Sequence, residues 1–322
     1  MPRKIILDVD TGTDDAVAIM LAALHPDLEL VACTVVNGNT SVDHCTNNTL
    51  RVLDHIGFQH VPVYRGLDRP LVRRDLPKPR QEGDVGSKMH GTALALPDSK
   101  RKAEAKGAIE FLVEMYRAAT EEITLVPVAP LTNIAAALAV EPRLVDQIPE
   151  IVIMGGSHAF GNITAAAEFN IWADPESAAV VFNAGFKKIT LVPLDATYKA
   201  TFSKQDCTDL DNLGTPAGRA AAMLIGQRIK SYDEIQPLEV AGYTPVHDAL
   251  AVAAVLDRSL ISTQYLHVDV ETAGAITLGR TVIDTQFRGA SRSRPANCHV
   301  AFDADAIRFR ALLKETFAKV YG

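Results

Sequence analysis

Residues 4–24 read KIILDVDTGTDDAVAIMLAAL, a short apolar run followed by a polar turn and a longer apolar run. The first run, residues 4–10, has the length and apolarity of a buried strand. The second run, residues 14–24, is predicted to be a helix, and Asp14 and Asp15 fall in its first turn, where the helix dipole favours carboxylates. This stretch therefore predicts a strand, a polar turn and a helix in direct succession.

The same alternation continues along the chain. The further predicted strands are residues 28–36, 61–64, 123–128, 151–154 and 189–194. The further predicted helices are residues 41–56, 108–118, 131–140, 175–183, 217–230, 247–256 and 304–317. Repeated alternation of strand and helix predicts an α/β, doubly wound fold, in which helices cover both faces of a mostly parallel central sheet.

No repeat, low-complexity tract or Ser/Gly-rich linker divides the sequence, so we expect residues 1–322 to form a single domain. A chain of this size can bury a large core without disulfides. Residues 67–106 are rich in Pro, Gly and charge, and a loop of this kind is either disordered or an active-site lid. Residues 231–244 are a second candidate mobile loop.

Composition excludes several classes of protein. Hydrophobic residues make up 48% and charged residues 22%, which excludes a disordered chain, and no apolar run approaches the roughly 20 residues of a membrane span. The net charge of −7, without a basic stripe, argues against nucleic acid as a partner. The start MPRKIILDVD lacks a secretory h-region, and the four cysteines show no pairing pattern. We therefore expect a cytoplasmic protein with reduced thiols.

Unusual polar residues follow the predicted strands. The first strand runs into Asp10 and the following turn, the second into Asn37-Gly38-Asn39, the strand at 123–128 into Thr132-Asn133, and the strand at 151–154 into Gly155-Gly156. Ligands of an open parallel sheet bind beyond the carboxyl ends of its strands. The sequence therefore predicts a pocket at that edge.

Four carboxylates, those of Asp8, Asp10, Asp14 and Asp15, lie within eight residues of one another. Carboxylates this close repel one another unless a cation lies among them, and oxygen ligands suit Ca²⁺ or Mg²⁺. An EF-hand is excluded because Gly12 falls at the fifth position of the loop. The alternative, that Asp14 and Asp15 only cap a helix, leaves Asp10 unexplained.

Other motifs leave alternatives open. Asp8-Val9-Asp10 after an apolar strand is also similar to the nucleophile loop of haloacid-dehalogenase-type phosphatases, although the usual Gly-Thr does not follow. No GxxxxGK[ST] phosphate loop is present. His247-Asp248 opens an apolar helix, and position alone does not separate a functional pair from an ordinary helix start. Asp174-Pro175 is typical of an N-cap followed by proline at the first helical position.

These pieces together resemble the inosine–uridine-preferring nucleoside hydrolase family. The family's opening pattern, D-x-D-x-G-x-D-D-A, matches residues 8–16 in full. Further segments follow in the family's order: NGN at 37–39, LVPVAPLTNIA at 125–135, MGG at 154–156, EFNIWADPE at 168–176, VHD at 246–248 and GAITLGRTVID at 274–284. The resemblance covers essentially the whole chain.

The resemblance implies Ca²⁺-dependent hydrolysis of the N-glycosidic bond of a ribonucleoside to ribose and free base. Asp10, Asp15, Asp248 and the main-chain carbonyl of Val128 would hold the Ca²⁺, and Asp10 would also be the general base for the attacking water. The family often has Thr where Val128 stands, but a backbone ligand tolerates that departure. The substrate-binding residues that the resemblance implies are Asp14, Asn39, Met154, Asn162, Glu168, Phe169 and Asn170.

His247 is similar to the family's candidate acid for the leaving base. The purine-specific branch has Trp at this position, so the chain resembles the inosine–uridine or pyrimidine-preferring members. The family commonly has a His-Gly-Glu/Asp pattern near Gly83, whereas residues 81–84 read QEGD, which leaves the base preference open. Gln227 and Tyr232 either touch the base or are polar residues of a surface helix.

Three function classes follow from these observations. The first is the nucleoside hydrolase. The second is a metal-dependent phosphohydrolase with Asp8 or Asp10 as nucleophile, and the third is a nucleoside-binding relative without catalysis. A ribonucleoside is the expected small-molecule partner, and the family's assemblies predict a homodimer or homotetramer.

Overall fold

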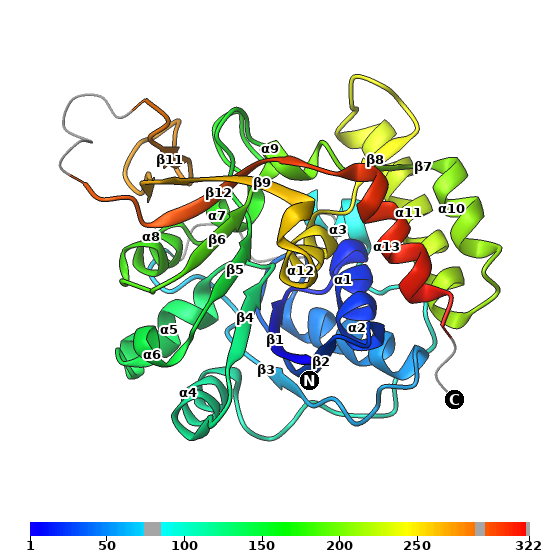
Figure 1. The fold of residues 1–322 in the computed structure, drawn as a ribbon, viewed down its shortest axis with the longest axis horizontal. Helices are drawn as coiled ribbons and strands as arrows, with labels where there is room; N and C mark the ends of the chain where they lie inside the picture. Colours follow the sequence, from blue (N-terminus) through cyan, green and yellow to red (C-terminus); the bar gives the residue numbers. More distant parts are fainter. Residues whose placement is uncertain (74–84, 287–293, 320–322) are drawn as a thin grey trace.

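A mostly parallel sheet of eight strands runs through the computed structural model, which describes residues 1–73, 85–286 and 294–319 (Figure 1). In spatial order its strands are β3 (Val63–Arg65), β2 (Leu28–Val35), β1 (Arg3–Val9), β4 (Ile123–Pro127), β5 (Ile151–Met154), β6 (Ile189–Val192), β12 (Cys298–Ala304) and β9 (Ile261–Leu266). Each neighbouring pair is parallel except β12 with β9, which is antiparallel. The α/β class that the alternation predicts is confirmed.

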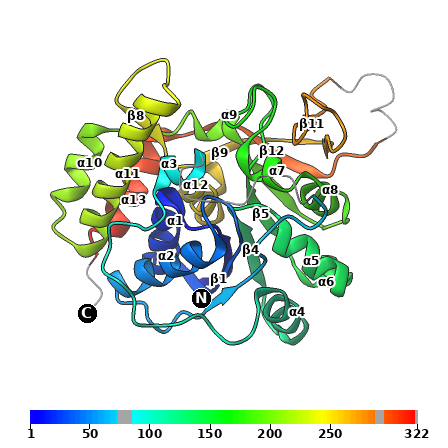
Figure 2. The ribbon, with the colours of Figure 1, turned by 180° about the vertical axis from the view of Figure 1, so that it is seen from behind.

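Helices cover both faces of this sheet, as Figures 1 and 2 show. On one face lie α1 (Thr13–Leu24), α2 (Val42–His55), α11 (Pro216–Ile235), α12 (His247–Leu256) and α13 (Ala306–Phe317). On the other lie α4 (Ala108–Ala118), α5 (Thr132–Val140), α6 (Leu144–Gln147) and α8 (Pro175–Asn183). Side chains alternate along β1, so Ile5 and Leu7 belong to the first core and Ile6 to the second.

Shorter elements complete the described part of the chain. The helices are α3 (Val85–His90), α7 (Phe169–Ala173), α9 (Leu194–Thr197), α10 (Lys204–Asp211) and the 3₁₀ turn η1 (Arg258–Leu260). The strands are β7 (Thr201–Ser203) with β8 (Tyr243–Pro245), and β10 (Val268–Val270) with β11 (Thr281–Ile283). Across this part of the chain, no helix combines the length and apolarity that a bilayer crossing requires.

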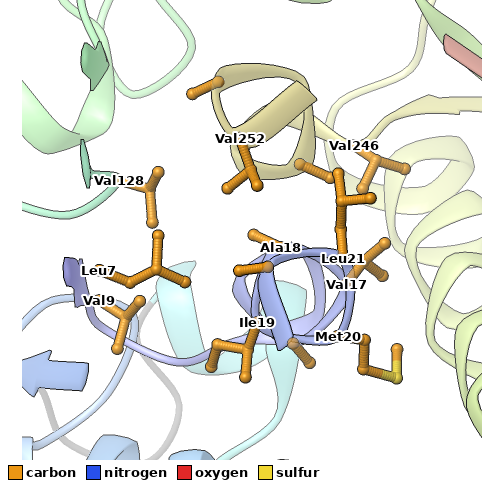
Figure 3. Close-up of a cluster of buried hydrophobic side chains, with 14 of the residues drawn as sticks. Leu7, Val9, Val17, Ala18, Ile19, Met20, Leu21, Val128, Val246 and Val252 are labelled. Atoms are coloured by element: carbon orange, nitrogen blue, oxygen red, sulfur yellow. The ribbon is translucent and has the colours of Figure 1, made fainter. Parts of the chain in front are cut away.

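Helix α1 is buried on every side, which explains why its sequence is apolar all round. Figure 3 shows Val252 of α12 pointing toward Ala18 of α1, while Leu7 lies on the sheet side of the same helix. Burying one such aliphatic side chain contributes roughly 1.5–3 kcal/mol. This packing fixes the N-terminus of α1, and with it Asp14 and Asp15, against the sheet.

The strand order places a ligand site beside β1. From β1 the chain proceeds outward through β2 and β3 on one side and through β4, β5 and β6 on the other. Such a reversal of strand order opens a crevice at the carboxyl ends of the two central strands. The residues that follow β1 and β4, from Asp10 and from Val128 onward, enter this crevice.

The structure places helices within two predicted loops. The predicted mobile loop at 67–106 contains α3, and residues 74–84 of it lie outside the described residues. The predicted loop at 231–244 begins inside a helix, since α11 runs on to Ile235. Ser231 and Tyr232 are buried there, and this inward packing extends the helix beyond the end predicted at residue 230.

Candidate active site

A pocket opens at the carboxyl edge of the sheet, above β1, β4 and β5. It is lined by Asp10, Asp14, Asn39, Met89, His90, Val128, Met154, Asn162, Ile163, Glu168, Phe169, Asn170, Arg228, Tyr232, Gln236, His247 and Asp248. Of the metal-binding, catalytic and ribose-binding residues that the resemblance implies, all line this pocket except Asp15. Residues that lie far apart in the sequence therefore meet in one place.

Asp15 lies behind the pocket wall, where it holds the turn between β1 and α1. Its carboxylate accepts the main-chain N–H groups of Asp10 at 3.1 Å and Gly12 at 2.9 Å. The Asn39 side-chain amide donates to the same carboxylate at 3.2 Å. Capping α1 is thus part of what Asp15 does, as the alternative interpretation of the sequence held.

Asp10 is held from the neighbouring loop. Its Oδ2 accepts the main-chain N–H of Asn39 at 2.6 Å. This approach requires glycine at position 38, because a Cβ there would collide with the Asp10 carboxylate. The NGN segment after β2 therefore serves to bring a backbone donor onto Asp10.

The carboxylates form one buried cluster. One oxygen each from Asp14, Asp15 and Asp248 lies within 4.8 Å of the others, and Asp10 neighbours the group. Burial, with repulsion from the neighbouring carboxylates, raises the pKa of Asp10 and of Asp248 well above the usual range and that of Asp15 to about 6. A cluster of this kind is the environment that a divalent cation stabilises, and its donors are all oxygen.

Asp14 differs from the other members because it has a cationic partner. Arg228 Nη1 donates to Asp14 Oδ1 at 2.8 Å. Burial alone would raise the pKa of Asp14, but the Arg228 charge, with His90 and His247 nearby, lowers it. Asp14 is therefore ionised beside the cluster.

The segment around α7 contributes ordered polar groups to the pocket wall. The Glu168 carboxylate accepts the main-chain N–H groups of Gly156 at 2.8 Å and Asn170 at 2.9 Å, and burial raises its pKa to about 7. The Asn170 side-chain amide donates to the carbonyl of Val128 at 3.0 Å. Asn162 Oδ1 accepts the Phe169 N–H at 2.8 Å. These bonds fix the directions in which this wall presents its donors and acceptors.

His247 begins α12 and lies deep in the pocket. Its Nε2 is 2.8 Å from the Tyr232 hydroxyl and its Nδ1 is 2.7 Å from the Thr197 hydroxyl. Burial, together with the Arg228 charge, lowers the pKa of His247 to about 3, so the ring is neutral at physiological pH. A neutral ring between two hydroxyls offers one donor and one acceptor.

His90 is a pocket residue that sequence reasoning missed. The family's histidine is missing from residues 81–84, where we expected it, yet α3 supplies His90, whose Nδ1 accepts the Thr13 N–H at 3.1 Å. The close approach requires Gly12, since a Cβ there would meet the imidazole. The dipeptide His90-Gly91 was the available signal, and it lies seven residues beyond Gly83.

Arg228 was missed as well, and its neighbour on α11 was proposed instead. The Gln227 amide donates to the carbonyl of His90 at 3.1 Å, so it holds α3 and does not line the pocket. Arg228 and Tyr232 line the pocket from the adjacent face of the helix. Of the two interpretations of Tyr232, contact with the base or polarity on a surface helix, the pocket position agrees with the first.

Comparisons with known proteins agree with this architecture. A sequence model of the family described as inosine-uridine preferring nucleoside hydrolase matches residues 5–311. The chain is 38% identical over 323 residues to the inosine-uridine preferring nucleoside hydrolase of Leishmania major, covering 99% of each. It is 36% identical over 313 residues to a pyrimidine-specific ribonucleoside hydrolase of Escherichia coli O157:H7, covering 97% of this chain and 96% of the relative. A solved structure, the purine-preferring ribonucleoside hydrolase from Gardnerella vaginalis, aligns with a TM-score of 0.89 and 32% identity over 98% of both chains.

Proposed function

The chain belongs to the inosine-uridine preferring nucleoside hydrolase family, and on that premise we propose that it hydrolyses the N-glycosidic bond of ribonucleosides to ribose and free base. The observation that carries the proposal is the composition of the pocket. Carboxylates, suited to a sugar that develops positive charge, line it together with the hydrogen-bonded pair His247 and Tyr232. This combination suits the charge separation of glycosidic cleavage.

We propose that the activity depends on Ca²⁺ held by Asp10, Asp15, Asp248 and the carbonyl of Val128. Two observations support this: the donors are all oxygen, and burial raises the pKa of three of these carboxyls, which a bound cation would counteract. When bound, the ion would supply Lewis acidity and attraction for the ribose hydroxyls.

Asp10 is the proposed general base. The Asn39 N–H orients its carboxylate through Oδ2, and this carboxylate would accept a proton from the attacking water. Direct attack of water on C1′, opposite the departing base, inverts the configuration. The surrounding carboxylates stabilise the oxocarbenium-like sugar.

The polar wall is proposed to select ribose. Asp14 and Asn170 would bind the 2′-hydroxyl, and Asn162 and Glu168 the 5′-hydroxyl, while Asn39, Met154 and Phe169 complete the sugar site. Each of these side chains lines the pocket, and those of Asn162, Glu168 and Asn170 are already held by hydrogen bonds to the backbone. A deoxyribose would leave buried groups unpaired and would therefore react slowly.

His247 is proposed to assist the leaving base. Because its pKa is lowered to about 3, the ring meets the substrate as a neutral donor in contact with the Tyr232 hydroxyl. A proton can reach the base through this pair as the bond to C1′ breaks. Inosine, uridine and cytidine are the candidate substrates, since the relatives' names differ in the base they specify.

The proposal is tested by measuring ribose release from inosine, uridine and cytidine, with phosphate release from a generic phosphomonoester as control. Ribose release without phosphate release is the expected result. Phosphate release would favour the phosphohydrolase alternative, although Asp8 faces Thr34 and Asn133 and does not line the pocket. Nucleoside binding without ribose release would identify an inactive relative.

The proposed setting is a cytoplasmic homodimer or homotetramer. Light scattering on the purified protein measures the assembly directly. A monomer at micromolar concentration would overturn this part of the proposal and leave the chemistry untouched.

A further inference from the structure

Arg228 has one nitrogen without a hydrogen-bond partner among the described residues. The side chain is only 3% exposed. Its Nε donates to the Pro245 carbonyl at 3.2 Å, and its Nη1 donates to Thr13 Oγ1 at 3.2 Å and to Asp14 at 2.8 Å. Within residues 1–73, 85–286 and 294–319, Nη2 has no hydrogen-bond partner. Because Arg228 lines the pocket, Nη2 can donate to a ligand that binds there.

Arg228 contacts both the carboxylate cluster and Tyr232. On one side it pairs with Asp14 of the carboxylate cluster, and on the other its Cζ lies 5.5 Å from the centre of the Tyr232 ring. Tyr232 in turn contacts His247 through its hydroxyl. The guanidinium therefore lies beside the part of the pocket where the proposed function places the base.

Cleavage creates a charge that this end of the pocket must stabilise. When the C1′–N bond breaks, its electron pair stays on the ring nitrogen and spreads onto the acceptor atoms of the base. Among the described pocket residues, Arg228 is the one side chain with a permanent positive charge, because a guanidinium does not lose its proton in proteins.

We propose that Arg228 is a further catalytic residue, whose free Nη2 donates to an acceptor atom of the leaving base and stabilises its anion. This inference rests on the proposed function. In the step, water forms the C1′–O bond and gives its proton to Asp10, while the C1′–N pair moves onto the base. The base then takes up one proton, so that nucleoside and water become ribose and free base.

The decisive variant is Arg228→Lys. Lysine keeps a cation beside Asp14, so the ribose end stays charged as before, but it lacks the planar fork and thus the second donor nitrogen. Arg219 lies on the same helix with its side chain exposed, so Arg219→Lys is the matched control. Circular dichroism of both variants checks that each is folded.

The first measurement compares leaving groups. Uridine and inosine release poor leaving groups that need stabilisation, whereas 4-nitrophenyl riboside releases a phenolate that is stable by itself. Loss of one preorganised donor typically costs about 10²–10³-fold in kcat, so we expect that loss for Arg228→Lys on the nucleosides and little change on the nitrophenyl riboside. Equal losses on all three substrates, or no loss on any, would overturn the proposal.

The second measurement needs no turnover. Isothermal titration with 5-nitrouracil, an anion at neutral pH, and with uracil, both in saturating ribose and Ca²⁺, compares anionic and neutral bases. We expect the wild type and Arg219→Lys to prefer the anion and Arg228→Lys to lose this preference; an unchanged preference contradicts the proposal. An inactive wild type would refute the proposed function, whereas an active wild type with an unaffected Arg228→Lys refutes this inference alone.

Discussion

The Tyr232 hydroxyl and the His247 Nε2 lie 2.8 Å apart, and they connect helices α11 and α12 inside the pocket. The Thr197 hydroxyl holds the other ring nitrogen at 2.7 Å, and the Tyr198 ring packs against the imidazole with a centroid distance of 5.5 Å. An imidazole held at both nitrogens has a fixed orientation. The His247–Tyr232 pair is thus preorganised in the pocket.

Replacing His247 by alanine separates leaving-group assistance from the rest of the chemistry. General acid catalysis contributes roughly 10²–10⁴-fold, so His247→Ala should lose about that much kcat on inosine or uridine. It should lose little on 4-nitrophenyl riboside, because nitrophenolate leaves unaided. Steady-state kinetics on both substrates gives the ratio of the two losses in kcat.

If His247 only begins α12 and positions Asp248, the losses will be equal on both substrates. Thr197→Val is the companion variant, since it removes one support of the ring and keeps the imidazole. Thr197→Val should also lose kcat on inosine and uridine and little on 4-nitrophenyl riboside, but by a smaller factor than His247→Ala.

Removal of the metal should abolish turnover. The carboxylate cluster predicts one Ca²⁺ per subunit with oxygen ligands only. Dialysis against a chelator should therefore inactivate the enzyme, and Ca²⁺ should restore it. Elemental analysis that found stoichiometric zinc, or full activity in the chelated protein, would contradict the assignment.

Asp10→Asn should fold and lose most of kcat, because the change weakens both the base and the proposed metal ligand. Substrate affinity should fall less, since other groups still hold the ribose. Asp8→Asn is the matched control: it lies two residues away, burial raises its pKa to about 7, and Thr34 and Asn133 hold it outside the pocket. Near-normal turnover of Asp10→Asn would assign the base role to another residue.

The sequence predicted the features of the site that depend on residues close together in the chain. A strand, a polar turn and a helix at residues 4–24 place Asp10, Asp14 and Asp15 together whatever surrounds them, and the structure has β1 and α1 there. The N-cap at Asp174 and the start of a helix at His247 are local features of the same kind, and both are confirmed. The alternation of strands and helices then predicted that these residues meet at the carboxyl edge of the sheet.

Residues placed by long-range packing were missed. Gln227 and Arg228 are adjacent on one helix, and only the rotation of α11 against α1 decides which of them lines the pocket. His90 belongs to a segment whose composition predicts a loop, and its place depends on Gly12, far away in the sequence. Neither the rotation of α11 nor the docking of His90 beside Gly12 follows from a periodicity or a spacing in the sequence.

The docking of His90 makes stability depend on pH. Burial, with the Arg228 charge nearby, lowers the pKa of His90 from its usual 6.5 to about 4. In the folded state its Nδ1 accepts the Thr13 N–H, so the ring is neutral. Below pH 6.5 the unfolded chain takes up a proton that the folded protein excludes until about pH 4, and the free energy of unfolding therefore falls as the pH drops through this window.

The shifted pKa of His90 lowers the free energy of unfolding by at most about 3 kcal/mol, because each pKa unit corresponds to 1.36 kcal/mol. His90→Asn removes the titrating ring and leaves an oxygen that can accept the Thr13 N–H. The wild type should therefore lose more stability between pH 7 and pH 4.5 than His90→Asn does, as measured by urea unfolding in chelator followed by circular dichroism. Identical losses in the two proteins would mean that His90 is not held neutral against Thr13 in the folded state.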